Sequence, residues 1–194
     1  MTMDLPEGFS CETAEGGFTL AAPLRCPVSE ARCLAMVCAS WVRAAVGADA
    51  AILWPNHVVL DGRRVCAVTC RATAGGTLVF TFRPDPAVLP VPAEDFRAGV
   101  LAAAVPALTG YPENRADLLT AYCEHCRTVM KFVHTAYRGM PLYGFAFAVD
   151  KHGGLMVMTQ ESRTVVTLYG GEAEIVRRED GPEETPELPP MPGR

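Results

Sequence analysis

The sequence lacks the long apolar runs and the basic balance that mark several common classes of protein. No stretch of its 194 residues approaches the roughly 18 consecutive apolar residues of a membrane-spanning helix. Lys and Arg number 17 against 22 Asp and Glu, so the net charge of −5 does not suggest a surface for nucleic acid or anionic lipid. The N-terminus carries Asp4 and Glu7 where a signal peptide would carry Lys or Arg. These absences predict a cytoplasmic protein that binds neither nucleic acid nor membrane.

The sequence also lacks the cysteine pattern of a metal site. Cysteines interrupt apolar runs at Cys33, Cys38, Cys66 and Cys70, in a chain long enough for an ordinary core, which predicts reduced, buried thiols. The segment 123–126 reads Cys-Glu-His-Cys, but a single Cys-x-x-Cys pair does not supply the four ligands of structural zinc. It lies within a helix-like run and not after a strand, as a thioredoxin motif would. We therefore predict no metal site.

The order of the elements predicts an α+β fold in two parts. Helical spacing favours helices at 29–46, 94–105 and 113–126, and Asp61-Gly62 between two β-rich runs is a hairpin signal. Four short strands between 143 and 176 predict a small barrel-like unit. The predicted segments are a lead-in at 1–16, a core at 17–128, a β unit at 140–178 and a tail at 179–194. The tail holds five Pro and five acidic residues, which predicts a disordered, solvated extension.

Two collinear blocks resemble biotin protein ligases. The first, Trp54-Pro55-Asn56-His57 followed by the hairpin to Val65, is similar to the Trp-Pro-Asn-Asp segment of that family and its hairpin. The second begins with the helix at 115–122 and continues through Gly144-Phe145-Ala146-Phe147-Ala148-Val149-Asp150, Gly153-Gly154-Leu155 and Leu168-Tyr169-Gly170-Gly171-Glu172-Ala173. It is similar to the helix that closes the ligase catalytic domain and to the small SH3-like domain that follows. The resemblance covers about residues 17–178.

The resemblance implies both a fold and a chemistry. The implied fold is a mixed β-sheet backed by helices, like the catalytic core shared with class II aminoacyl-tRNA synthetases, with a small SH3-like β-barrel after it. Family members use ATP and magnesium to convert biotin to biotinoyl-adenylate, and then transfer biotin to a lysine of a biotin carboxyl-carrier protein. That chemistry needs positive groups around the α-phosphate and a shaped pocket for biotin.

This chain departs from the family at the positions that carry the chemistry. The Gly-Arg-rich loop and the Ser-Thr-Asn segment of the family would precede residue 17, and the sixteen residues there contain no Arg. Leu53 stands where the family usually has a lysine, and His57 stands where it has an aspartate. Arg64 corresponds to the catalytic lysine, and a planar guanidinium does not reproduce the geometry of an ammonium. Ala67 replaces a glycine. The pattern is that of a ligase truncated at its N-terminus and with degenerate catalytic motifs.

Three hypotheses of function follow. The first is a non-catalytic ligand-binding or assembly module, a pseudoenzyme that keeps part of the pocket. The second is a biotin-carrier-protein ligase whose adenylate-binding loop comes from a partner polypeptide or a second copy in a homodimer. The third is different chemistry on the same scaffold, with His57 and Arg64 as the reacting pair. The ligand-binding residues implied by the resemblance are Trp54, Pro55, Asn56, Arg64, Val65 and Ala67.

Overall fold

The computed structural model describes residues 4–137, 140–169 and 173–179, which form two antiparallel sheets and three α-helices. The first sheet has the strand order β1-β2-β6-β5-β4-β3, and all its strand pairs are antiparallel. Its strands are β1 (Ser10–Ala14), β2 (Gly17–Pro23), β3 (Ala51–Leu53), β4 (His57–Leu60), β5 (Arg63–Ala72) and β6 (Thr77–Pro84). The hairpin predicted at Asp61-Gly62 joins β4 to β5, and both turn residues have positive φ.

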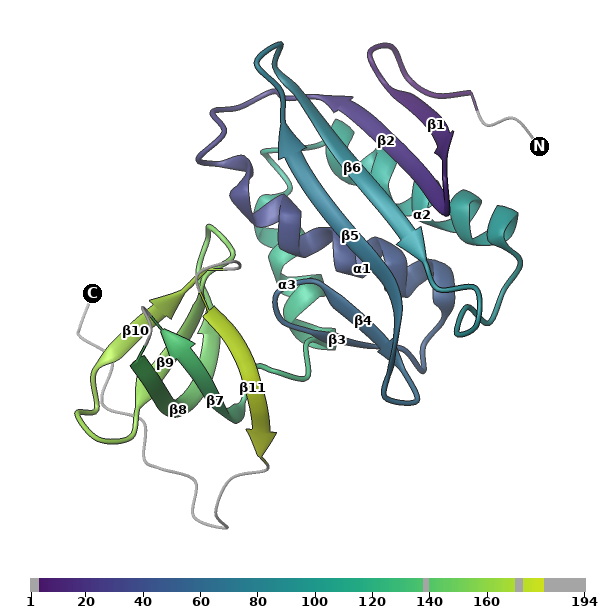
Figure 1. Ribbon diagram of the computed structural model, residues 1–194. Helices are drawn as coiled ribbons and strands as arrows, with labels where there is room; N and C mark the ends of the chain where they lie inside the picture. Colours follow the sequence, from purple (N-terminus) through teal and green to yellow (C-terminus); the bar gives the residue numbers. More distant parts are fainter. Residues whose placement is uncertain (1–3, 138–139, 170–172, 180–194) are drawn as a thin grey trace.

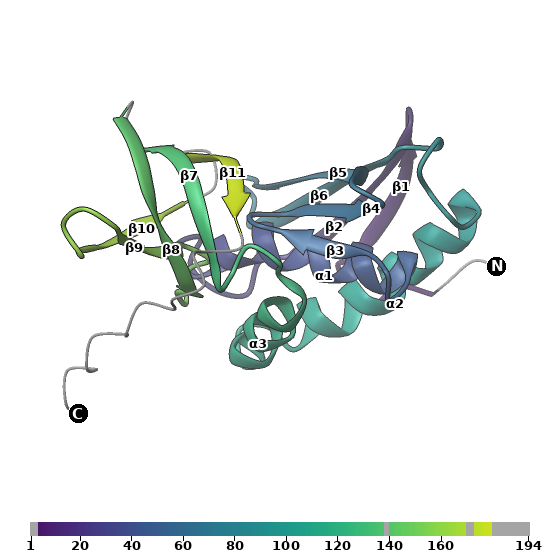
Figure 2. The ribbon, with the colours of Figure 1, turned by 90° about the horizontal axis from the view of Figure 1, so that it is seen from below.

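Helices cover one face of this sheet, and none of the described helices covers the other. Figures 1 and 2 show α1 (Leu34–Val46) and α2 (Ala93–Thr109) packed behind the sheet, with α3 (Arg115–His125) below them. The strands alternate accordingly: Leu20, Phe80 and Phe82 face the helices and are fully buried. Val37 and Val42 of α1 complete this core from the helix side. The α+β fold with a sheet backed by helices, predicted from the sequence, is therefore confirmed.

The second sheet has five strands in the order β10-β9-β8-β7-β11. They are β7 (Lys131–Tyr137), β8 (Met140–Val149), β9 (Leu155–Thr159), β10 (Val165–Leu168) and β11 (Ala173–Glu179). The chain passes from the first sheet to the second after an isolated parallel bridge between Ile52 and Cys126. No helix in the described part of the chain is long and apolar enough to cross a membrane.

Two segments differ from the sequence-based expectation. The segment Ser10–Ala14, expected within a lead-in, is the edge strand β1, paired to β2 along its whole length. The second sheet begins at Lys131, not at residue 140, because β7 pairs with both β8 and β11. The tail from residue 180, expected to be disordered, lies outside the described residues, and the SH3-like character of the second sheet stays a prediction.

Candidate functional site

The Trp-Pro-Asn segment joins the two sheets. The Trp54 side chain is buried, and its indole N–H donates to the Gly153 carbonyl at 3.1 Å. The Trp54 backbone N–H donates to Thr128 Oγ1, and the Tyr122 hydroxyl donates to the Pro55 carbonyl. Trp54 is therefore a structural link between the core and the second sheet, with its polar atom already satisfied.

Asn56 holds the loop against the core. Its Nδ2 donates to the Ala35 carbonyl at 3.1 Å and to the Val68 carbonyl at 3.2 Å. Through these bonds one side chain connects the start of α1, the Trp-Pro-Asn loop and the middle of β5. The three elements diverge beyond Asn56, and the space between them is a cavity.

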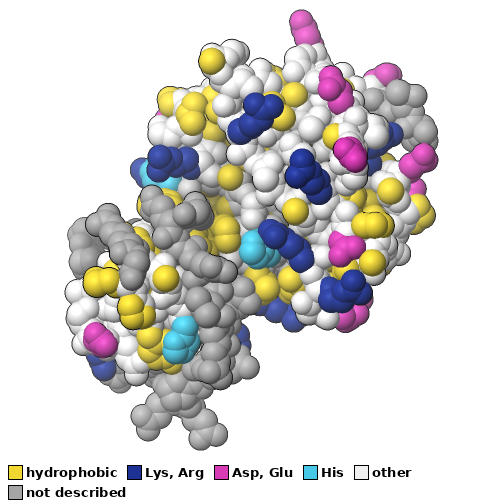
Figure 3. Space-filling view, viewed as in Figure 1, with side chains coloured by type: hydrophobic (Ala, Val, Ile, Leu, Met, Phe, Trp, Pro, Cys, Tyr) yellow, Lys and Arg dark blue, Asp and Glu magenta, His cyan; other side chains and the backbone are white. Residues whose placement is uncertain are grey.

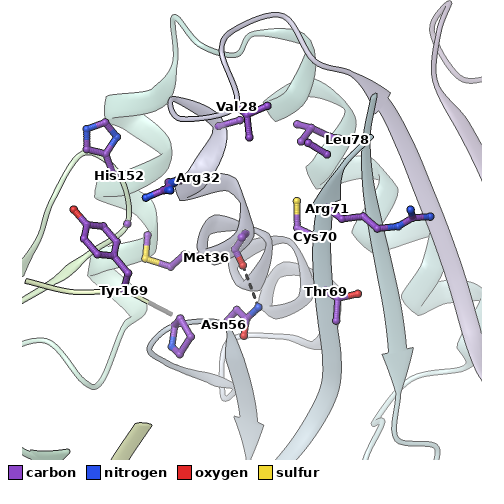
Figure 4. Close-up of a pocket in the computed structure, with 15 residues that line it drawn as sticks. Val28, Arg32, Met36, Asn56, Thr69, Cys70, Arg71, Leu78, His152 and Tyr169 are labelled. Atoms are coloured by element: carbon purple, nitrogen blue, oxygen red, sulfur yellow. Dashed lines mark hydrogen bonds between the residues drawn. The ribbon is translucent and has the colours of Figure 1, made fainter. Parts of the chain in front are cut away.

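This cavity, which we call the junction pocket, has a volume of about 580 Å³. Its walls come from α1 and the turn before it, the Trp-Pro-Asn loop, β5, and the second sheet (Figure 4). Apolar side chains supply part of the lining, and the polar lining side chains include Arg32, Asn56, Thr69, Arg71, His152 and Tyr169. A pocket of this size with a few convergent polar groups is typical of small-molecule sites.

The second sheet contributes its part of the lining through a hydrogen-bonded turn and through Tyr169. Asp150 Oδ1 accepts hydrogen bonds from the backbone N–H groups of His152 and Gly154, both at 2.8 Å. Asp150 Oδ2 accepts from the Tyr169 hydroxyl at 2.9 Å. Gly153 has a φ of 88°, a conformation that favours glycine, and this turns its carbonyl toward Trp54. One carboxylate thus positions both His152 and Tyr169 at the pocket.

His152 lines the pocket and also carries an unsatisfied polar atom. Its Nδ1 is buried and has no hydrogen-bond partner in the described part of the chain. A buried polar atom without a partner costs free energy, but because this atom has almost no accessible surface, a ligand in the junction pocket does not reach it. In Figure 4, His152 and Arg32 lie on the same side of the pocket, opposite Leu78 and Cys70. Burial raises the pKa of the Cys70 thiol to about 12, so this thiol is uncharged at pH 7.

The open face of the first sheet adjoins the pocket through Thr69 and Arg71. Residues paired across strands share a face: Val59 with Arg64, Ala67 with Arg83, and Arg71 with Val79. Successive side chains of a strand point to opposite faces of the sheet. Because Val58 is buried on the helix side, its neighbour His57 on β4 lies on the open face with these arginines. We call the surface formed by His57, Arg64, Arg71 and Arg83 the basic face. Figure 3 shows basic side chains gathered over this sheet.

No Asp or Glu occurs in β2, β4, β5 or β6, so the basic face has no carboxylate among its central strands. The ion pair found among the described residues, between Arg115 and Glu30, lies elsewhere and does not engage the basic face. Magnesium prefers carboxylate oxygens, and these strands offer none. The basic face therefore does not fit magnesium, and it does fit an anion.

The residues implied by the resemblance separate into three groups in the structure. Pro55 and Asn56 line the junction pocket. His57, Arg64 and Ala67 lie on the open side of the sheet, away from the pocket lining. Trp54 is a buried link, and Val65 is fully buried in the core, so neither is exposed to a ligand.

The pocket residues that sequence reasoning missed are Arg32, Arg71, His152 and Tyr169. They belong to four separate segments of the chain, and no local motif connects them. The packing of the turn before α1, of β5 and of the second sheet brings them together.

Comparison with solved structures identifies the fold. The apo biotin protein ligase from Aquifex aeolicus aligns with a TM-score of 0.61 at 16% identity, over 84% of this chain and 83% of that one. The Aquifex enzyme in complex with biotin and ATP aligns with a TM-score of 0.57 at 14% identity, over 84% and 79%. A biotin protein ligase-like protein of unknown function from Silicibacter sp. TM1040 aligns with a TM-score of 0.63 at 12% identity, over 78% and 77%.

The chain therefore has a biotin protein ligase-like fold, as the resemblance predicted. The sequence itself matches no protein-family model and no curated protein. At these identities the likeness concerns the fold, and the activity has to be argued from the site.

Proposed function

We propose that this protein is a ligand-binding module on a biotin ligase-like scaffold and that it does not ligate biotin by itself. The observation that carries the proposal is the junction pocket. It combines apolar walls with the cationic side chains of Arg32 and Arg71. Its ligand class is a small organic anion with an apolar body. Biotin belongs to that class, and the Aquifex neighbour is described in complex with biotin and ATP.

The positions that would carry ligation argue against catalysis by this chain alone. Activation of a carboxylate by ATP requires groups that offset the charge at the α-phosphate. The basic face supplies arginines, but Arg64 does not line the pocket where Asn56 lies. Loss of one well-placed electrostatic donor commonly costs about 10²–10³ in rate. We therefore expect no useful transfer of biotin to a carrier domain by the purified protein with ATP and magnesium. Turnover approaching about once per minute would contradict this part of the proposal.

Binding is tested by calorimetry and thermal shift with biotin, lipoate, ATP and a biotinoyl-adenylate mimic. A ligand at one hundred times its Kd adds about 2.7 kcal/mol to the stability of the folded state. A pocket-filling variant, Ala35→Phe, places a ring in the lining and should abolish the shift. Ala44→Phe is the matched control, because Ala44 is exposed on the same helix outside the pocket. The same response in both variants, or no response to any ligand, would refute the pocket as the site.

The second proposal is a biotin-carrier-protein ligase whose adenylate-binding loop comes from a partner polypeptide. It is supported by one edge of β5 that faces the pocket. The Val65 carbonyl accepts from Asp85 on the β6 side, and the Val68 carbonyl accepts from Asn56 on the opposite side. By alternation, the backbone groups of Cys70 and Ala72 also point away from β6. The pairing of β5 with β4 ends at Cys66, and no strand in the described part of the chain pairs with this edge beyond it, so an added strand would extend the sheet there. Biotin transfer that appears only after addition of a Gly-Arg-rich partner chain would favour this alternative.

A further inference from the structure

The free edge of β5 lies where the junction pocket meets the basic face. The pocket is lined by Cys70, which pairs with the buried Phe80 on the helix side of the sheet, and by Arg71 on the open side. The pocket therefore reaches around the edge of the strand. Figure 4 shows the Arg71 side chain leaving β5 away from the cavity. A ligand that occupies the pocket and also meets the Arg71 guanidinium has to cross this edge, so it has to be elongated.

Backbone groups line this crossing. The N–H and C=O groups of Cys70 and Ala72 point away from β6, on the side where Asn56 donates to the Val68 carbonyl. Asn56 closes this edge at Val68, and β5 ends at Ala72. The open stretch is therefore shorter than a usual strand of about five or six residues. It suits a small molecule with two amide groups better than a peptide strand.

The far side of the crossing is cationic. Arg71 and Arg83 are exposed on the open face, and Arg83 lies opposite Ala67, four residues along β5 from Arg71. At about 3.3 Å per residue, their backbones are roughly 13 Å apart along the strand. No carboxylate occurs in the central strands to neutralise them. Guanidinium groups bind phosphate through paired hydrogen bonds, so these arginines favour a ligand that carries several phosphate charges.

We propose that the ligand of the junction pocket is an acyl thioester of coenzyme A, an inference that rests on the pocket being the binding site proposed above. The acyl chain lies between the apolar walls at Met36 and Leu78. The two amides of the pantetheine arm bond to the β5 edge at Cys70 and Ala72, and the phosphates meet the arginines of the basic face. The arm is about as long as four extended residues, roughly 13 Å, and crossing one layer of packed structure takes roughly 10 Å.

The experiment compares hexanoyl-CoA, CoA and hexanoate by isothermal titration calorimetry on the full chain. We expect hexanoyl-CoA to bind at least tenfold more tightly than either part alone, because each part supplies contacts that the other lacks. Arg83→Gln should weaken binding of hexanoyl-CoA at least fivefold and leave that of hexanoate unchanged, because Arg83 does not line the pocket. Arg163→Gln is the matched control, because Arg163 is an exposed arginine in the turn between β9 and β10.

A second variant tests the strand edge. Ala72→Pro removes an N–H group that points to the pocket but no hydrogen bond to β6. It should weaken binding of hexanoyl-CoA about tenfold and leave that of hexanoate unchanged. Urea unfolding of the same variant checks that the fold is retained, and Arg83→Gln tests the inference independently of it.

Four outcomes would overturn the inference. Equal affinities of hexanoyl-CoA and hexanoate would mean that the coenzyme makes no contact, and would leave the pocket as the binding site. Unchanged binding of hexanoyl-CoA to the pocket-filling variant Ala35→Phe would place the coenzyme on another surface. Unchanged binding to both Arg83→Gln and Ala72→Pro would rule out the path across the edge. Binding of biotin or lipoate without binding of hexanoyl-CoA sinks this inference alone, whereas binding of no ligand at all refutes the proposed function as well.

Discussion

The two faces of the six-stranded sheet differ in almost every respect. The face toward α1 and α2 presents Leu20, Phe80 and Phe82, all fully buried. Phe80 meets Trp41 of α1 edge-on, with ring centroids 5.1 Å apart. The opposite face presents threonines, small apolar residues and the arginines of the basic face. The same strands build both faces, so alternation alone separates them.

This difference separates the residues that stabilise the fold from those that are available to a ligand. Buried aromatic side chains stabilise the fold through the area they remove from water. Exposed arginines on a sheet contribute little to stability and are available to a ligand. The following predictions test this division, from the largest expected effect to the smallest.

Removal of a buried ring should have the largest effect. Phe80→Ala leaves a cavity beneath Trp41, and we expect it to lower the free energy of unfolding by about 3–5 kcal/mol. Thr81→Val, one residue further on the open face, should change it by less than about 0.5 kcal/mol. Urea unfolding followed by circular dichroism measures both values. Equal losses in the free energy of unfolding would mean that Thr81 on the open face stabilises the fold as much as Phe80 does.

The covered face should also protect its thiols. Burial raises the pKa of both Cys66 and Cys70 to about 12. At pH 8 the thiolate fraction of such a group is roughly 10⁻⁴, against roughly 0.1 for an ordinary thiol of pKa 9. We expect both cysteines to react with iodoacetamide about 1,000-fold more slowly in the native protein than in urea. Peptide mapping by mass spectrometry gives the two rates, and labelling of Cys66 at the unfolded rate would contradict its burial.

Most of the fold could be predicted from local sequence signals. The hairpin at Asp61-Gly62 and the helix ending at Gly47 follow from turn and cap chemistry that acts within a few residues. The strand Ser10–Ala14 was missed because its residues have no strong alternation, and its pairing with β2 decides its structure. The strand Lys131–Tyr137 was missed for a similar reason: its pairing to β8 and β11 is tertiary.

The site was less predictable than the fold. The Trp-Pro-Asn motif pointed to the correct region, since Pro55 and Asn56 line the junction pocket. The motif could not show that the Trp54 indole bonds to Gly153, ninety-nine positions away. Nor could it show that Arg32 and His152 share a cavity with it. Such contacts depend on how the second sheet packs on the first, which no local pattern encodes.

The contact between the two sheets should depend on the Trp54 hydrogen bond. Trp54→Phe keeps a ring but removes the donor to the Gly153 carbonyl, leaving a buried acceptor unsatisfied. Trp41→Phe is the matched control, because the buried Trp41 indole N–H has no hydrogen-bond partner in the described part of the chain. We expect Trp54→Phe to cost about 1–3 kcal/mol more than the control. A loss no greater than that of the control would show that this bond does not couple the sheets.

The smallest effect on stability should come from the basic face itself. Arg83→Gln removes one charge of an exposed side chain whose neighbouring arginines lie roughly 10–13 Å away by strand spacing. That separation is about one Debye length at physiological ionic strength, so little repulsion is relieved. We expect the free energy of unfolding to change by less than about 0.5 kcal/mol in either direction. Urea unfolding at low and at physiological salt should give the same value within that range. A loss above about 1.5 kcal/mol would place Arg83 among the residues that stabilise the fold. The two faces would then not differ in their contribution to stability at Arg83, the middle position of the basic face.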